Sequence, residues 1–289
     1  MSKFGEVLFA APQPSDRLIA LGLTVALSVI FAFVAPFAAV PLLRIPAYIP
    51  LYDSAVIIND LLTGTAFAAL FCARGDRGLL FLAAGNLWTA LLAAAHLLSF
   101  PGVFGPTGLW SGPQTAAWLY MAWHIGLPLA VILYTVAGSR TIWSRPRALM
   151  IGGLAVAVAA LWLVVLSAGG LDLLPAILQR DDRKPLASLI SGGICLVAAF
   201  AMGRVLGGRH GPWAASPGGL SRGSNRLDLS LAVVLYAWIG DVVLSGVLNA
   251  GRYSLGWYVG RFFGYLAVSL VLYHMLLLSV VEHFPRARQ

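Results

Sequence analysis

Long apolar stretches separated by short polar connections dominate the sequence. A helix needs about 20 apolar residues to cross a bilayer core. Backbone groups in lipid must bond within their own segment, so such stretches are expected to be helical. The pattern predicts an all-α integral membrane protein, a bundle of eight transmembrane helices, at Leu18–Val40, Asp53–Ala73, Gly78–Ser99, Thr115–Gly138, Ala148–Ala168, Pro185–Leu206, Leu227–Ala250 and Val259–Val281.

Composition agrees with a membrane protein. The 289 residues are 60% hydrophobic and only 10% charged, whereas a soluble domain carries about 25% charged residues. The net charge of +8 comes from Lys and Arg in the short connections. Such residues orient a protein in the lipid bilayer, which explains the positive charge. We therefore expect the bilayer, and no nucleic acid, as the partner of these residues.

The basic residues predict the orientation of the chain. Alternating the connections places 13 of the 19 Lys and Arg residues on one side of the membrane and 6 on the other. The positive-inside rule then puts both termini in the cytoplasm. We expect residues 1–17 to be a cytoplasmic segment, 18–281 an eight-helix membrane sensor domain and 282–289 a cytoplasmic tail. The connection 207–226, rich in Gly, Ser and Pro, is expected to be a flexible cytoplasmic loop.

Ionisable side chains inside the second span are candidate functional residues, because such groups are costly in a membrane. Asp53 and Asp60 are seven residues apart and share a helix face. We expect Asp60, about two turns deeper, to bind a proton or cation, or else to bond to a neighbouring helix. Asp53 is expected mainly as a charge at the start of the helix.

Two histidines lie in the predicted outer half of the third and fourth spans. His96 is near the outer end of its span, and Tyr120, His124 and Pro128 form a stripe at intervals of four. Pro128 has no N–H, so the carbonyl of His124 should be a free acceptor. His96 and His124 could approach each other. They could then ligate haem or a metal, or shape a polar pocket without one, which we favour.

The seventh span carries the longest polar stripe. Trp238, Asp241, Ser245, Asn249 and Arg252 follow one helix face from mid-membrane to the outer surface. Arg252 at the mouth could attract an anion or pair with an acidic side chain. The alternative is a ladder of hydrogen bonds between helices.

The eighth span begins with a ridge of small residues, Gly256, Gly260 and Gly264, which is typical of close helix packing. Arg261 could pair with Asp241, with Asp60 or with an acidic ligand, or could extend its charged end to the membrane surface. Together these spans predict a polar pocket in the outer half, formed by Asp60, His96, Tyr120, His124, Trp238, Asp241, Ser245, Asn249, Arg252 and Arg261.

Three segments of the sequence resemble a known family. They are Arg44–Asp53, Gly85–Gly108 and Gly112–His124, the last beginning Gly-Pro-Gln-Thr. Nearly the whole chain is similar to the membrane-associated sensor domain of the fourth type in the MASE group. The resemblance implies a sensor in the inner membrane of a bacterium, of a kind commonly fused to diguanylate cyclase (GGDEF) or histidine kinase modules. Here we expect the domain to stand alone without such an output module, or the chain to be a fragment.

The function expected from residues and resemblance is sensing. A small periplasmic or membrane ligand would enter a periplasm-facing pocket, and the chain would signal to a cytoplasmic partner or act as a homodimer. A proton-coupled transporter or channel, using Asp60, Asp241 and His274 as a relay, is the alternative. A bis-histidine haem or metal protein is the second. No Walker, HExxH or CxxC motif occurs, so an enzyme is not expected.

Overall fold

The fold is that of a computed structural model, which describes residues 3–110, 112–137, 144–168, 174–179, 182–183, 185–207 and 225–283. Eight helices in this part are long and apolar enough to cross a membrane, as the hydropathy pattern predicts. Most of the expected loop 207–226, and the expected tail beyond residue 283, lie outside the described residues.

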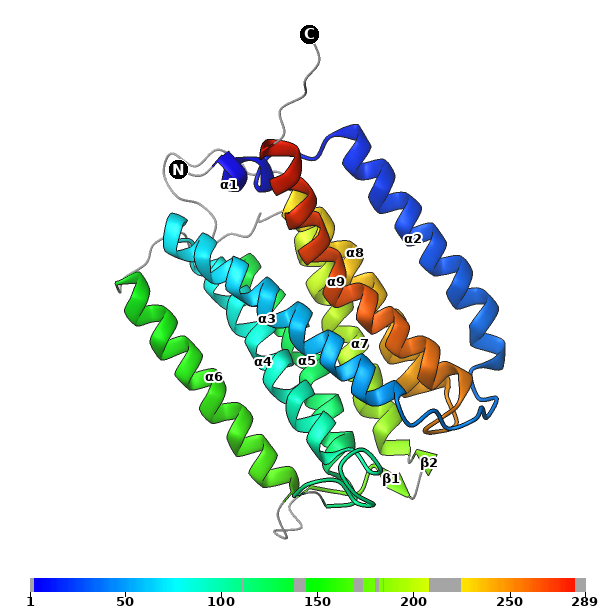
Figure 1. The fold of residues 1–289 in the computed structure, drawn as a ribbon. Coiled ribbons are helices and arrows are strands. Elements are labelled where there is room, and N and C mark those ends of the chain that lie inside the picture. The colour runs from blue at the N-terminus through cyan, green and yellow to red at the C-terminus, as the bar shows by residue number, and fades with distance from the viewer. Residues whose placement is uncertain are drawn as a thin grey trace.

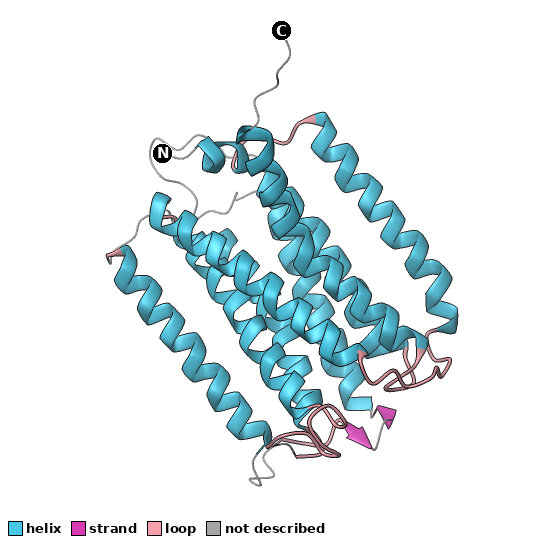
Figure 2. Cartoon of the chain, viewed as in Figure 1, coloured by secondary structure: helices cyan, strands magenta, loops and turns pink. Residues whose placement is uncertain are grey.

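Helices account for nearly all of the described structure (Figure 2). A 3-10 turn, η1 (Ala35–Phe37), follows α2, a π-helical turn, η2 (Leu244–Leu248), follows α8, and β1 (Leu178–Gln179) pairs antiparallel with β2 (Asp182–Arg183). The helices are α1 (Lys3–Leu8), α2 (Pro14–Val34), α3 (Tyr48–Arg74), α4 (Arg77–Ser99), α5 (Thr115–Val136), α6 (Arg145–Ala168), α7 (Pro185–Leu206), α8 (Arg226–Val243) and α9 (Leu255–His283).

The bundle has inner and outer helices. Figure 1 shows α2 and α6 flanking the other helices on opposite sides. Only 6% of the most apolar window of α2 or α6 is buried, against 67% in α8 and α9. Apolar side chains on α2 and α6 therefore face outward, as expected of helices at the surface of a membrane protein.

Both ends of the described chain lie at the same end of the bundle, which we call the terminal end. There α1 lies beside the last turns of α9 (Figure 1), and the Leu8 side chain is fully buried. The connections α2–α3, α4–α5 and α8–α9 lie at the opposite end, which we call the far end. The residues expected to precede the membrane domain, 1–17, therefore include a helix packed on the bundle and the first turn of α2.

A tight turn makes α3 and α4 antiparallel neighbours. Gly75 ends α3 in the left-handed region at φ 74°, a conformation that glycine adopts without steric cost. The Asp76 carboxylate then accepts a hydrogen bond from the Gly78 N–H at 2.8 Å and caps α4. Residues equally distant from this turn face each other across the two helices.

The glycine ridge of α9 packs against α8, as its spacing predicts. A Cβ atom on Gly260 would lie 2.9 Å from the Asp241 carbonyl oxygen, and one on Gly264 would lie 2.4 Å from Oδ2 of the Asp241 carboxylate. No real side chain tolerates such distances. The ridge therefore brings the α9 backbone against the residues that form the polar centre of the bundle.

One predicted helix start, and the regular geometry predicted for the end of another helix, are wrong in ways that move functional residues. The α3 helix begins at Tyr48, because Pro50 fits in a first turn where its missing N–H is not needed. Asp53 is consequently a buried residue one turn inside α3 rather than a charge at its start. The α-helical part of α8 ends at Val243, so Arg252 lies beyond the helix and not on its stripe.

Candidate ligand-binding chamber

A small polar cavity lies among α4, α5, α7, α9 and the end of α8, toward the far end. Its volume is about 60 Å³, enough for a few water molecules or a small ion. We call this cavity the chamber. It is lined by His96, Phe100, Ala116, Ala117, Tyr120, Met121, Ile177, Ala187, Ser245, Asn249, Gly251, Arg252, Trp257 and Arg261.

One wall of the chamber rests on a buried hydrogen-bond network between α5 and α8. His124 Nε2 lies 3.0 Å from Oδ2 of Asp241, and both side chains are fully buried. The Tyr120 hydroxyl lies 3.1 Å from Oδ1 of Asp241 and 2.6 Å from the Ser245 hydroxyl. Ser245 also donates to the Asp241 carboxylate, at 2.8 Å. Four predicted residues therefore form one network, with Tyr120 and Ser245 facing the chamber.

The imidazole of His124 has a polar contact at each ring nitrogen. Nδ1 of His124 lies 2.7 Å from the Tyr120 carbonyl oxygen, which can only accept, so Nδ1 carries a hydrogen. The contact between Nε2 and Asp241 needs a second proton, on one atom or the other. His124 thus links Tyr120 on its own helix to Asp241 on α8 and keeps no free ring nitrogen.

The His124 carbonyl oxygen, which Pro128 leaves without a backbone donor, accepts a hydrogen bond from a side chain on α8. The Trp238 indole donates to the His124 carbonyl oxygen at 2.8 Å. The sequence predicted a free acceptor at this position because Pro128 cannot bond back to it. The proline thus removes one bond within α5, and the indole replaces it with a bond between α5 and α8.

His96 pairs with a different carboxylate. Its Nδ1 lies 2.7 Å from Oδ2 of Asp53 on α3. The second oxygen of Asp53, Oδ1, is buried and has no hydrogen-bond partner among the described residues. The His96–Asp53 pair therefore joins α3 to α4 at the edge of the chamber and keeps one unsatisfied acceptor.

The two histidines do not face each other. The Trp123 ring lies between them, with its centroid 5.1 Å from each imidazole. Both ring nitrogens of His124 are already engaged, Nδ1 with the Tyr120 carbonyl oxygen and Nε2 with Asp241, so neither is left to ligate iron. The described residues also contain no group of three or more His, Cys, Asp or Glu side chains placed to hold a metal. This arrangement does not fit the bis-histidine haem hypothesis.

Arg261 on α9 is a buried cation at the chamber. Only 4% of it is exposed, and it donates to the Trp257 carbonyl oxygen at 3.1 Å. The guanidinium lies 4.0 Å from the centre of the Trp257 ring and 5.0 Å from that of Tyr120, which stabilises a cation modestly. Within the described ranges Arg261 makes no ion pair, and its Nε has no partner.

Arg252 and Asn249 complete the far side of the chamber. Asn249 donates to the Gly251 carbonyl oxygen at 3.1 Å, and the Arg252 guanidinium lies 4.9 Å from the centre of the Phe100 ring. Both residues line the chamber although the helix has ended before them. The chain after η2, and not a helical stripe, places them there.

Asp60 lies apart from the other predicted residues. It lines a separate cavity between α3, α4 and α6 and does not line the chamber. His274, the last member of the expected relay, bonds to Ser230 at 2.5 Å near the terminal end. Asp241 bonds to His124, Tyr120 and Ser245 instead. No hydrogen bonds among the described residues join the three groups, so the geometry does not favour a proton relay.

Sequence reasoning missed the role of Asp53 and the position of Trp123. A usable signal existed for Asp53, since it and His96 are almost equally far from the Gly75–Asp76 turn. Two antiparallel helices joined by such a turn bring these positions together. No comparable signal existed for Trp123, because only packing decides which of nine Trp residues lies between the histidines.

A helical membrane bundle with a buried polar chamber is therefore the class of protein that the fold defines. The sequence matches the family described as "Membrane-associated sensor, integral membrane domain" (MASE4) over residues 43–283. The chain belongs to this family and is a multi-pass integral membrane protein. No curated protein and no solved structure matches the chain.

Proposed function

We propose that this protein is a sensor that acts by binding, without catalysis, and that the chamber recognises a small anion. Membership of the MASE4 family supports the sensor role. The observation that carries the anion is Arg261, a buried guanidinium that faces the cavity and has no ion pair in the described structure. A buried charge without a partner is costly, and an anionic ligand would relieve that cost.

The size and lining of the chamber restrict the ligand. A cavity of about 60 Å³ suits an inorganic anion or a short carboxylate better than a drug-sized molecule. Arg252 supplies a second positive charge, and the Tyr120 and Ser245 hydroxyls, which already donate within the Asp241 network, add polar surface to the lining.

The orientation proposed for the protein puts this chamber on the periplasmic side of a bacterial inner membrane. The bias of Lys and Arg supports cytoplasmic chain ends. The far end, where the chamber lies, would then face the periplasm. The same rule would put the segments 1–17 and 282–289, bounded by the first and last apolar stretches, in the cytoplasm.

A path from the chamber to the cytoplasm is available in α9. This helix carries Arg261 near its start and runs as one element to His283 at the terminal end. A ligand that prefers one packing of α9 against α8 would shift the population of the two packings. We propose that a cytoplasmic partner, or a second copy of the chain, reads this shift.

Thermal unfolding in nanodiscs with added phosphate, sulfate, acetate or succinate tests the chamber. An anion at a hundred times its Kd should stabilise the protein by about 2.7 kcal/mol. The stabilisation should disappear in Arg261→Gln and persist in Arg17→Gln, which removes the same charge from an exposed site on α2. Equal stabilisation of both variants, or no effect of any of the four anions on the wild type, would refute the proposal.

A further inference from the structure

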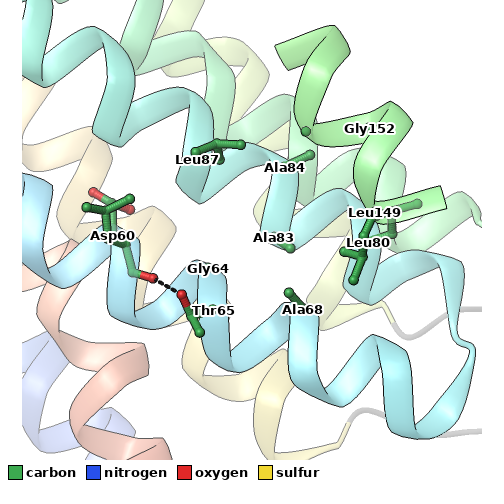
Figure 3. Close-up of a pocket in the computed structure, with 12 residues that line it drawn as sticks. Asp60, Gly64, Thr65, Ala68, Leu80, Ala83, Ala84, Leu87, Leu149 and Gly152 are labelled. Carbon is green, nitrogen blue, oxygen red and sulfur yellow. Dashed lines mark hydrogen bonds between the residues drawn. The ribbon is translucent and has the colours of Figure 1, made fainter. Parts of the chain in front are cut away.

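A second cavity lies between α3, α4 and α6, extending from the middle of the bundle toward its terminal end, and we call it the crevice. Its volume is about 180 Å³. Figure 3 shows that small residues form much of its lining, among them Gly64, Ala68, Ala83 and Gly152. An apolar cavity of about 150 Å³ is large enough to bind benzene, so the crevice has room for part of a lipid-sized molecule.

The crevice is loosely packed and reached from the side. A Cβ atom on Gly152 of α6 would meet only Leu80, at 3.7 Å, and one on Gly153 would meet only Leu87, at 3.9 Å. These are ordinary contacts, so α6 does not press closely on α4. Leu61 at the edge of the crevice is 46% exposed on the outer surface of α3. A molecule dissolved in the bilayer could therefore enter between α3 and α6.

Asp60 supplies a buried polar group to this otherwise apolar space. Asp60 lies at one end of the lining and Leu149 at the other (Figure 3). Only 2% of Asp60 is exposed, and its Oδ2 has no hydrogen-bond partner among the described residues. It makes no ion pair there either. At 1.5 Å per residue it lies about 18 Å from the start of α3 and about 21 Å from its end, near the middle of the membrane.

An unpartnered carboxyl group at that depth is expensive unless something bonds to it. A hydroxyl group both donates and accepts, so it can bond to the carboxyl group in either protonation state. A ketone can only accept, and an ammonium group would bring its own charge into the middle of the bilayer. The apolar lining suits a hydrocarbon chain attached to the hydroxyl.

We propose that the crevice binds a lipid-soluble alcohol from the bilayer, with its hydroxyl on Asp60 and its hydrocarbon along the small residues of α3, α4 and α6. This site is separate from the chamber and does not depend on the anion proposed there. It would give the protein a second input, from the membrane itself.

Photolabelling of the full chain in nanodiscs tests the site. The probe is a hexadecanol analogue with a diazirine near the hydroxyl, compared with the matching amine, methyl ketone and hydrocarbon. Peptides of α3, α4 and α6 around the crevice should be labelled by the alcohol about fivefold more than by the hydrocarbon, the factor that one hydrogen bond supplies. Unlabelled hexadecanol should compete.

Variants of the crevice provide the controls. Asp60→Leu should reduce labelling by the alcohol to the level of the hydrocarbon. Gly152→Leu should abolish labelling by filling the crevice, since only Leu80 lies near the added side chain. Gly22→Leu places the same side chain on α2, where nothing lies within 4 Å, and should leave labelling unchanged. Unfolding midpoints identify any variant that fails to fold.

Three results would overturn the proposal. The first is equal labelling by alcohol and hydrocarbon. The second is alcohol labelling that survives Gly152→Leu in a folded protein. The third is stronger labelling by the amine or the ketone, which would assign the crevice to a different chemical class.

Discussion

Trp238→Phe tests whether a hydrogen bond between α5 and α8 replaces the backbone hydrogen bond that Pro128 removes from α5. The indole N–H of Trp238 donates to the His124 carbonyl oxygen at 2.8 Å, and both side chains are buried. Pro128 has removed the backbone donor that this carbonyl would have within α5. Phenylalanine keeps a ring in place but has no N–H. The substitution should therefore leave the carbonyl without any donor.

The expected cost of Trp238→Phe follows from two losses. Hydrogen bonds between membrane helices contribute about 0.6 kcal/mol on average and up to about 1.7 kcal/mol. The smaller ring also loses contact with the His124 imidazole, whose centroid lies 4.8 Å from that of the indole. A lost buried partner costs about 1–3 kcal/mol in all, and we expect Trp238→Phe to lower the free energy of unfolding by that amount.

A double-mutant cycle with Pro128→Ala separates the two losses. Alanine at position 128 restores an N–H that can bond to the His124 carbonyl oxygen within α5. Trp238→Phe should then cost less by about 0.6–1.7 kcal/mol, the worth of one such bond, whereas the loss of ring contact stays the same and cancels. Reversible unfolding in detergent micelles gives the four free energies.

The matched control is a cycle of Trp238→Phe with Leu129→Ala. Leu129 neighbours Pro128 in sequence but is an exposed side chain on α5. The effects of these two substitutions on the free energy of unfolding should be additive within about 0.3–0.5 kcal/mol. The explanation is wrong if the effects of Trp238→Phe and Pro128→Ala on the free energy of unfolding are also additive within that limit. The indole hydrogen bond would then not replace the missing backbone hydrogen bond of α5.

Two further substitutions test the packing of α8. Gly264→Ala places a Cβ atom 2.4 Å from Oδ2 of Asp241 and should destabilise the protein by about 1–3 kcal/mol, whereas Gly192→Ala, with nothing within 4 Å, should not; equal thermal shifts would contradict the glycine-ridge argument. Tyr134→Phe removes the hydroxyl that donates to Asp228 at 2.8 Å and should cost about 1.5–3 kcal/mol in unfolding experiments. A cost near zero would show that water replaces this hydroxyl.

Local patterns were sufficient for part of the site. The stripe Trp238, Asp241, Ser245 on α8 and the stripe Tyr120, His124 on α5 follow from helical period alone, and the structure joins them in one network. The free carbonyl of His124 followed from the chemistry of proline. These features depend only on residues three to four positions apart, which any helix brings to one face.

The positions of the other site residues depended on how the helices are rotated and on which helices are neighbours. Asp53 and Asp60 share a face of α3, yet Asp53 meets His96 and Asp60 lines the crevice with α6. Trp123, the residue after Ala122, lies between two histidines for reasons of packing alone. Arg252 reached the chamber through the irregular chain after η2, which helical period does not describe.

The sequence by itself therefore determined eight apolar helices and the polar face of several of them, because hydropathy and period are properties of consecutive residues. Only the tertiary structure decided which polar faces meet. That choice depends on close contacts between distant residues, such as the glycine ridge of α9 against Asp241. In a membrane, packing of this kind, and not hydrophobic burial, selects the neighbours of each helix.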